Sequence, residues 1–232
     1  MARKITSLIL KSIIVLSSAT GVIIHVAESY TSLLYFTTQS NMWIGVTCLV
    51  GLVLMLLKKP VKKWMYSIKL IFTVSITLTG VVYCTMLAPF YEGNAYTFSS
   101  TLLHVIVPVV SVVDFFVYDC VQYKKWECVV VITPPLYYLI FAGIGYVFNW
   151  DFGYDGQNYP YFFLNWGSPA GAFGFSSVSP YMGVFYYVLI LLVFVVGIGA
   201  LYILLTRLIL RKVASKQQLL LDSATSTQDN TK

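Results

Sequence analysis

"GVFYYVLILLVFVVGIGALYILL", residues 183–205, contains no charged side chain. A helix of about 20 apolar residues is long enough to cross the roughly 30 Å of hydrocarbon in a bilayer. This stretch therefore predicts a membrane-spanning helix. Its apolar surface and the small residues Gly197 and Gly199 indicate lipid contact and helix packing rather than chemistry.

The rest of the chain repeats this pattern. The 232 residues are 58% hydrophobic and only 10% charged, whereas soluble domains carry about 25% charged residues. Six spans are predicted, at about 7–27, 32–57, 66–88, 100–120, 128–149 and 181–207. We therefore expect an all-α integral membrane protein with one six-helix domain over residues 1–210 and a polar tail over residues 211–232.

The charge distribution predicts an orientation. All 15 Lys and Arg residues fall on one side if both termini are cytoplasmic, and this set includes Lys11 and Lys69. The connections on the other side carry Glu28, Glu92, Asp151 and Asp155. The net charge of +6 then reflects topology and attraction to anionic lipid, not nucleic-acid binding. Short loops and the lack of an N-x-S/T sequon fit a bacterial plasma membrane.

Two further features concern the loops and the cysteines. Residues 150–180, "WDFGYDGQNYPYFFLNWGSPAGAFGFSSVSP", are rich in Gly, Pro and aromatic residues and contain no Lys or Arg. We expect this segment to form an aromatic outer cap between the fifth and sixth helices, the alternative being a plain interfacial loop. The four cysteines show no CxxC spacing, so no disulfide framework, metal site or cofactor is expected.

Polar residues concentrate in "YFTTQSNMW", residues 35–43. Intramembrane polar groups are costly and tend to mark function. Helical spacing places one set on a single face: Thr37, Ser40, Asn41, Ile44 and Cys48. A second such stripe lies on the fourth span: His104, Pro108, Ser111 and Asp114.

Three polar groups are predicted to lie at a similar depth in the membrane. Thr37 and His104 are each expected a few residues below the outer ends of their helices, and His25 is near the outer end of the first. Asp114 is about 15 Å deeper than His104 along the axis, too far to orient its imidazole. A threonine hydroxyl beside a neutral histidine is typical of an activated nucleophile. Gln39, Asn41 or a backbone N–H could then donate to a developing oxyanion.

These polar residues also suit roles without catalysis. Thr and Ser in membrane helices often bond to the preceding turn, and Asn and Gln often join helices, so a polar packing cluster accounts for the pattern too. A proton-linked transporter of a small solute could use His25, His104 and Asp114 as a relay. A binding or scaffold protein could use the polar layer to fix helix register.

Three motifs resemble a known family. "FTTQSN" (36–41), "LLHVIVPVVSVVD" (102–114) and "YPYFFLN" (159–165) are similar to those of the androgen-induced and androgen-dependent membrane hydrolases, and most closely to their bacterial six-span relatives. The resemblance covers about residues 7–210. It implies a threonine hydrolase of lipid esters, with membrane lipid as the substrate and no cofactor.

The resemblance also implies roles for residues. Thr37 would be the nucleophile, with Thr38 as the rival position, and His104 would be the base. The candidates for substrate or oxyanion contacts are Gln39, Asn41, Thr38, Tyr159 and Asn165. Candidates for polar support are His25, Ser111 and Asp114. The outer half of the chain has no basic residue, so a lipid headgroup would be uncharged or held by backbone, Tyr and Asn groups. The oligomeric state is left open.

Overall fold

The computed structural model describes residues 2–91, 93–153 and 156–229, with side chains from Arg3 to Gln218 within those ranges. Glu92, Asp155 and Lys232, whose sides of the membrane were predicted from charge, lie outside the described residues. Within these ranges, six helices are long and apolar enough to cross a membrane. They run over Arg3–Glu28, Phe36–Leu56, Lys63–Phe90, Phe98–Tyr118, Glu127–Val147 and Val184–Gln218. The predicted helical, multi-pass architecture is confirmed at this level.

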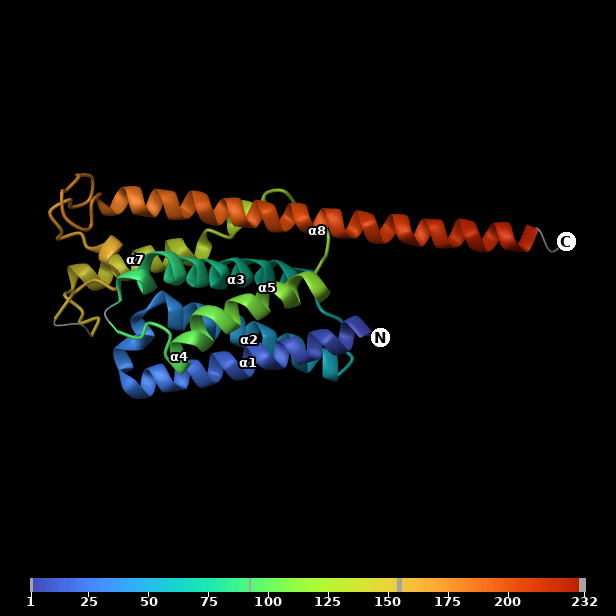
Figure 1. Ribbon diagram of the computed structural model, residues 1–232, viewed down its shortest axis with the longest axis horizontal. Coiled ribbons are helices and arrows are strands. Elements are labelled where there is room, and N and C mark those ends of the chain that lie inside the picture. The colour runs from blue at the N-terminus through green and yellow to red at the C-terminus, as the bar shows by residue number, and fades with distance from the viewer. Residues whose placement is uncertain (1, 92, 154–155, 230–232) are drawn as a thin grey trace.

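The long helices lie side by side, and α8 follows one side of the bundle and extends beyond it (Figure 1). They are α1 (Ala2–Glu28), α2 (Phe36–Leu56), α3 (Lys63–Val82), α5 (Val107–Tyr118), α7 (Thr133–Val147) and α8 (Val184–Asp229). Two short helices are α4 (Phe98–Thr101) and α6 (Glu127–Val130). Three 3₁₀ turns are η1 (Tyr30–Leu34), η3 (Ala88–Phe90) and η5 (Phe162–Leu164), and two π-helical turns are η2 (Tyr83–Leu87) and η4 (Leu102–Ile106).

Small residues allow the first helices to approach closely. Helix α1 packs against α2 and α5, and α3 packs against α2, α5 and α8. A Cβ atom on Gly45 would overlap Ser18 Oγ, and one on Gly21 would lie 2.6 Å from a methyl carbon of Leu103. Close contact of this kind is the usual basis of helix association in membranes.

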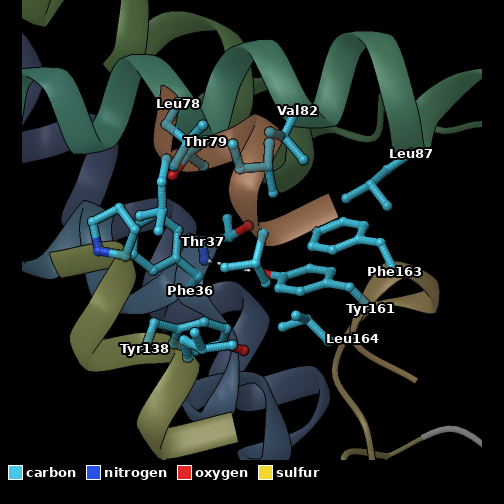
Figure 2. A pocket seen from close by; sticks show the side chains of 15 residues that line it. Phe36, Thr37, Leu78, Thr79, Val82, Leu87, Tyr138, Tyr161, Phe163 and Leu164 are labelled. Atoms are coloured by element: carbon cyan, nitrogen blue, oxygen red, sulfur yellow. Dashed lines mark hydrogen bonds between the residues drawn. The ribbon is translucent and has the colours of Figure 1, made fainter. Parts of the chain in front are cut away.

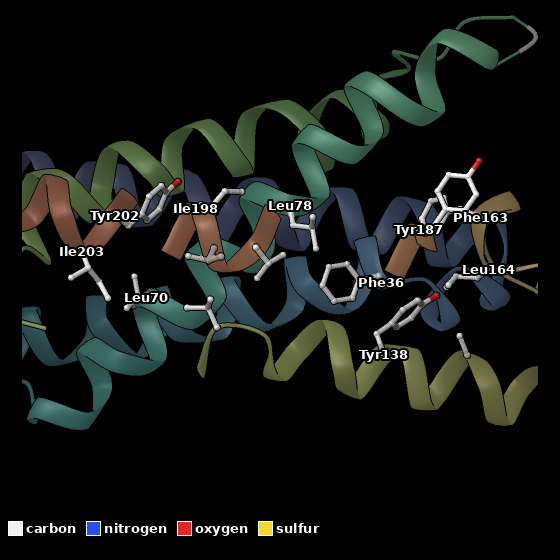
Figure 3. Packing of buried hydrophobic residues seen from close by; sticks show 14 of the residues in the cluster. Phe36, Leu70, Leu78, Tyr138, Phe163, Leu164, Tyr187, Ile198, Tyr202 and Ile203 are labelled. Atoms are coloured by element: carbon white, nitrogen blue, oxygen red, sulfur yellow. The ribbon is translucent and has the colours of Figure 1, made fainter. Parts of the chain in front are cut away.

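The core has two apolar clusters. The larger is rich in aromatic residues and joins α2, α3, α7 and α8, and Figure 3 shows Phe36, Tyr138 and Leu78 packed within it. The smaller lies between α1, α2, α3 and α5, and consists of Ile14, Ile44, Cys48, Ile76 and Val107. Ile44 and Cys48 are fully buried, so the face that these residues share on the second span is turned into the bundle.

Every predicted span differs from the structure by at least one residue at each end, and two of these differences bear on the site and on the tail. The second span was expected from residue 32, but α2 begins at Phe36, because Tyr35 is extended with φ −87° and ψ 142°. Thr37 is therefore in the first turn of α2. The sixth span was expected to end at 207, yet α8 continues to Asp229, since residues 208–229 contain no Gly or Pro to stop a helix.

Two of the lysines predicted on the cytoplasmic side are buried inside the bundle. Lys11 is 3% exposed and Lys69 is 4% exposed. Both amino groups contact the Asp114 carboxylate, at 2.6 and 3.0 Å. Opposite charges compensate one another for the loss of water, which explains how these lysines can be buried.

The segment between α7 and α8 folds against one end of the bundle. This end, where α1 finishes at Glu28 and α2 starts at Phe36, is called the site end below. Phe152 is 1% exposed, and the Tyr35 hydroxyl donates to its carbonyl at 2.7 Å. Phe163 and Leu164 of η5 are also buried and belong to the larger core cluster.

Candidate active site

A large cavity opens at the site end. Its volume is about 1020 Å³, and its walls come from the end of α1, η1, the start of α2, η2, η4 and the segment that precedes α8. Thr37, Thr38, His25 and His104 all line it. The structure thus brings together, in one cavity, the residues that the sequence placed in one layer.

The imidazole of His104 is held in one orientation. It is 6% exposed and stacks on Tyr83, with ring centroids 3.5 Å apart and planes 16° apart. His104 Nδ1 lies 2.9 Å from the Ser100 carbonyl oxygen and 3.2 Å from Ser100 Oγ. A carbonyl oxygen only accepts, so a neutral His104 carries its proton on Nδ1. The lone pair is then on Nε2, the nitrogen that can act as a base.

The hydroxyl groups of Ser100 and Tyr83 extend the hydrogen-bond network beyond the His104 ring. Ser100 Oγ donates to the Tyr83 hydroxyl at 2.7 Å, and Tyr83 donates to the carbonyl of Ala95. Each hydroxyl in this series donates to the next oxygen atom. His104 is therefore oriented by a carbonyl and a hydroxyl, and the contacts described for it include no carboxylate. Asp114 does not reach it, as its depth in the sequence predicted.

The backbone near His104 is irregular for a physical reason. His104 lies in the π-helical turn η4, and Pro108 follows four residues later without an N–H to donate to the His104 carbonyl. Helix α3 passes this point at Gly80, where a Cβ atom would lie 3.0 Å from both the His104 carbonyl oxygen and Pro108 Cβ. Asn41 Nδ2 donates to the neighbouring Leu103 carbonyl at 3.1 Å. Turns of π type recur at functional sites.

The start of α2 carries both threonines. Thr37 is 9% exposed and Thr38 is 1% exposed. The Thr37 N–H donates to the Tyr161 hydroxyl at 3.4 Å, and the Thr37 side chain interacts with the same phenol. Thr38 Oγ1 has no hydrogen-bond partner among the described atoms. The first N–H groups of a helix lack partners in the helix and form its positive end, so this turn is suited to stabilise negative charge.

A second, smaller pocket lies beside Thr37 (Figure 2). Its volume is about 80 Å³, and its walls are mostly apolar side chains of α2, α3, α7, η5 and α8. Thr37, Tyr161 and Leu87 line both spaces. Figure 2 shows the phenol of Tyr161 reaching toward Thr37. Burial raises the pKa of the Tyr161 phenol, which keeps the phenol protonated and able to donate.

The other predicted contact residues lie outside the two spaces. Gln39 Nε2 donates to the Leu33 carbonyl at 3.2 Å. Asn41 Nδ2 donates to the Thr37 carbonyl at 2.8 Å as well as to Leu103. Asn165 accepts from the Gly167 N–H at 3.0 Å. Neither these three nor Tyr159 lines either space, and Asn41 instead fixes α2 against η4.

The predicted support residues are divided between two places. His25 lines the large cavity, and its ring centroid lies 6.5 Å from that of His104. Ser111 is fully buried, and its Oγ has no partner among the described atoms. Asp114 is fully buried in a network away from the cavity. Ser7 Oγ donates to Asp114 at 2.7 Å, alongside the two lysines.

Sequence reasoning missed several of these residues. Tyr83 and Tyr161 were not singled out, although Tyr161 lies two residues beyond Tyr159 in the same quoted motif. Pairing of Asp114 with a lysine was one alternative that the sequence offered, but the lysines were not identified and two further contacts were missed: Asp119 contacts Lys11 at 3.0 Å, and Lys69 contacts Cys48 Sγ at 2.9 Å. The one available signal was spacing, since Ser100 precedes His104 by one helical turn. Among the described residues, no group of three or more His, Cys, Asp or Glu is placed to hold a metal ion.

Comparisons with family models, with curated proteins and with solved structures found no match to this chain.

Proposed function

We propose that this protein is an intramembrane hydrolase that cleaves a lipid ester, with Thr37 as nucleophile and His104 as base. The observation that carries the proposal is the shared cavity: Thr37 and His104 both line it, and the Ser100 carbonyl leaves Nε2 of the imidazole with its lone pair. A buried hydroxyl and a base of fixed tautomer are the two components that covalent ester hydrolysis needs.

The reaction would proceed in two stages. In the first, Nε2 takes the proton of Thr37 Oγ while that oxygen bonds to the ester carbonyl carbon. The carbon–oxygen bond to the alcohol then breaks, and the alcohol leaves with the proton from Nε2. In the second, Nε2 takes a proton from water, the hydroxide attacks the acyl carbon, and Thr37 Oγ leaves and regains the proton. The products are a carboxylic acid and an alcohol.

Negative charge on the carbonyl oxygen needs donors in both stages. The positive end of α2 and the Tyr161 phenol lie beside Thr37, and such groups stabilise an oxyanion. The sequence offered Gln39, Asn41 or a backbone N–H for this role, and the two amide groups donate to backbone carbonyls. Thr38 remains the rival nucleophile, because it lines the same cavity and its hydroxyl has no partner among the described atoms.

We further propose that the site end faces the outer leaflet of a plasma membrane, with both termini cytoplasmic. The support is the sequence bias: basic residues lie toward the opposite end, and the connections at the site end have none. The segment before α8 would then be the outer cap, since Phe152 and Tyr161 enter the walls of the cavity. No nucleic-acid partner is proposed.

The contacts of Asp114 favour hydrolysis over a proton relay. Its carboxylate is engaged by Lys11, Lys69 and Ser7, and it contacts neither histidine. A relay through His25, His104 and Asp114 needs groups that can exchange protons along a path. The paired state of Asp114 instead suits a structural role.

A fluorophosphonate probe tests the proposal. The nucleophilic oxygen bonds to phosphorus and fluoride leaves, so an active hydroxyl becomes labelled. The purified protein should label, and Thr37→Ala and His104→Ala should each abolish labelling. Thr47→Ala is the matched control. Thr47 is on the same helix and lines neither space, and its hydroxyl donates a hydrogen bond to the Trp43 carbonyl. Labelling of both site variants at the control rate would refute the proposal.

A further inference from the structure

The pocket beside Thr37 is lined mostly by apolar side chains, which suggests an apolar ligand. Thr37 and Tyr161 line both this pocket and the large cavity. The pocket runs between α3, α7 and α8, past Leu78 and Leu139 to Leu191. Figure 2 shows Leu78 and Val82 of α3 facing Tyr138 and Leu164 across this space. A group bound in it would have one end at the proposed nucleophile.

Polar atoms in the pocket walls already have partners. Thr79 Oγ1 contacts Ser40 Oγ at 2.8 Å and bonds to the Ser75 carbonyl at 3.2 Å. The Tyr138 hydroxyl donates to the Leu34 carbonyl at 3.0 Å. Beyond Thr37 and Tyr161, the walls therefore offer a ligand only hydrocarbon contact. A polar ligand would lose its hydration in this pocket without compensation.

The pocket reaches the side of the bundle. Its inner walls are buried: Phe36 is 7% exposed and Leu78 is 5% exposed. Its outer walls on α7 and α8, at Leu139 and Leu191, are only half-buried. These helices are candidate membrane spans, so in a bilayer this side of the pocket lies next to hydrocarbon. A chain longer than the roughly 80 Å³ space can continue into the bilayer.

The large cavity has more polar walls than the apolar pocket. Its walls include Glu28, Asn94, Ser29 and Thr97 together with aromatic side chains. Its volume is also more than ten times that of the apolar pocket. Polar groups of a substrate can be hydrated or hydrogen-bonded there, which they cannot be in the apolar pocket.

We propose that the acyl chain of the ester binds in the apolar pocket between α3, α7 and α8, and that the alcohol part binds in the large cavity. This inference rests on the proposed hydrolase function. The ester carbonyl is then at Thr37, which lines both spaces. Each added methylene group in the pocket adds buried apolar surface, which favours binding, so the site selects esters with a long, unbranched acyl chain.

Chain-length preference tests the inference. Hydrolysis of 4-nitrophenyl decanoate and 4-nitrophenyl acetate is measured for the purified protein in nanodiscs. Leu191→Trp should lower the decanoate-to-acetate rate ratio roughly ten-fold, because the larger indole would displace about two methylene groups of the acyl chain from the pocket. Ile190→Trp is the matched control: Ile190 is the adjacent residue, is 56% exposed and does not line the pocket. Its ratio should equal that of the wild type.

A second pair of variants changes the opposite wall of the pocket, on α7. It tests the inference even if Leu191→Trp does not fold. Leu139→Phe should also lower the ratio, whereas Ile140→Phe, at a position 65% exposed, should not. An unchanged ratio in both pocket variants, with hydrolysis still abolished by Thr37→Ala, overturns the acyl pocket and leaves the hydrolase intact. Wild type that hydrolyses neither ester, or Thr37→Ala that hydrolyses both, overturns the hydrolase and the acyl pocket with it.

Discussion

His104 lies face to face with Tyr83, with 3.5 Å between the ring centroids. Each ring projects from a π-helical turn, η4 for His104 and η2 for Tyr83. The Ser100 hydroxyl connects them through contacts to His104 Nδ1 and to the Tyr83 hydroxyl. Two irregular turns on different helices thus fix the plane and the tautomer of the proposed base.

Tyr83→Ala should slow probe labelling strongly. Loss of the ring removes a stacked pair worth about 0.5–1.5 kcal/mol beyond its buried area and lets the imidazole turn. A misplacement of about 1 Å can reduce a rate roughly 100-fold. Tyr83→Phe keeps the stack and removes only the hydroxyl, so its labelling rate should fall much less. Equal rates for both variants would show that the stacking does not orient His104.

Tyr161→Phe should slow labelling with little change in thermal stability. The variant keeps the buried ring but removes the phenol beside Thr37, and loss of one oxyanion donor costs roughly 100- to 1000-fold in rate. Because burial raises the pKa of this phenol, it stays a donor at neutral and mildly alkaline pH. Tyr159→Phe is the matched control and also tests the residue that the sequence favoured. A larger effect at Tyr159 would make Tyr159, not Tyr161, the contact residue.

Gly80→Ala should destabilise the bundle and slow labelling together. The new methyl group would lie 3.0 Å from the His104 carbonyl oxygen and from Pro108, so α3 or η4 must shift. Overpacking of this kind costs about 1–3 kcal/mol. Gly197→Ala has no atom within 4 Å of the new methyl and should leave both properties unchanged or raise stability slightly. Thermal unfolding in detergent measures the difference, and identical melting for both variants would contradict the packing described.

The buried lysines and aspartates should behave as two coupled pairs. Asp114→Asn leaves Lys69 without a carboxylate partner, since Lys11 still has Asp119. Removing one partner of a buried ion pair costs about 3–5 kcal/mol. The double variant Asp114→Asn, Lys69→Met removes one charge of each sign and should recover much of that loss. A double variant as unstable as the sum of the single variants would exclude the coupling.

Much of the fold follows from hydropathy alone. Six apolar stretches gave six long helices, and the inward stripes at Thr37 and His104 are buried because a period of 3.6 residues fixes which side chains share a face. Equal depth then brought Thr37, His25 and His104 into one cavity. These properties depend on local pattern, and the sequence contains that pattern.

Other features depend on contacts between distant segments. The pairing of Lys69 with Asp114 joins residues on α3 and α5, and no local pattern shows that these lysines turn inward. Tyr35, where the helix breaks, donates to the carbonyl of Phe152, more than 100 residues later. Tyr161 rather than Tyr159 reaches Thr37 because the segment between α7 and α8 is irregular, with no period from which direction can be inferred.

The position of the covalent adduct tests the central claim most directly. The protein is labelled with a fluorophosphonate, digested, and sequenced by tandem mass spectrometry across residues 35–43, which separates Thr37 from Thr38. We predict an adduct on Thr37 Oγ that disappears in His104→Ala and persists in Thr38→Val. An adduct on Thr38, on a residue outside this turn, or one that forms equally without His104 would contradict the account.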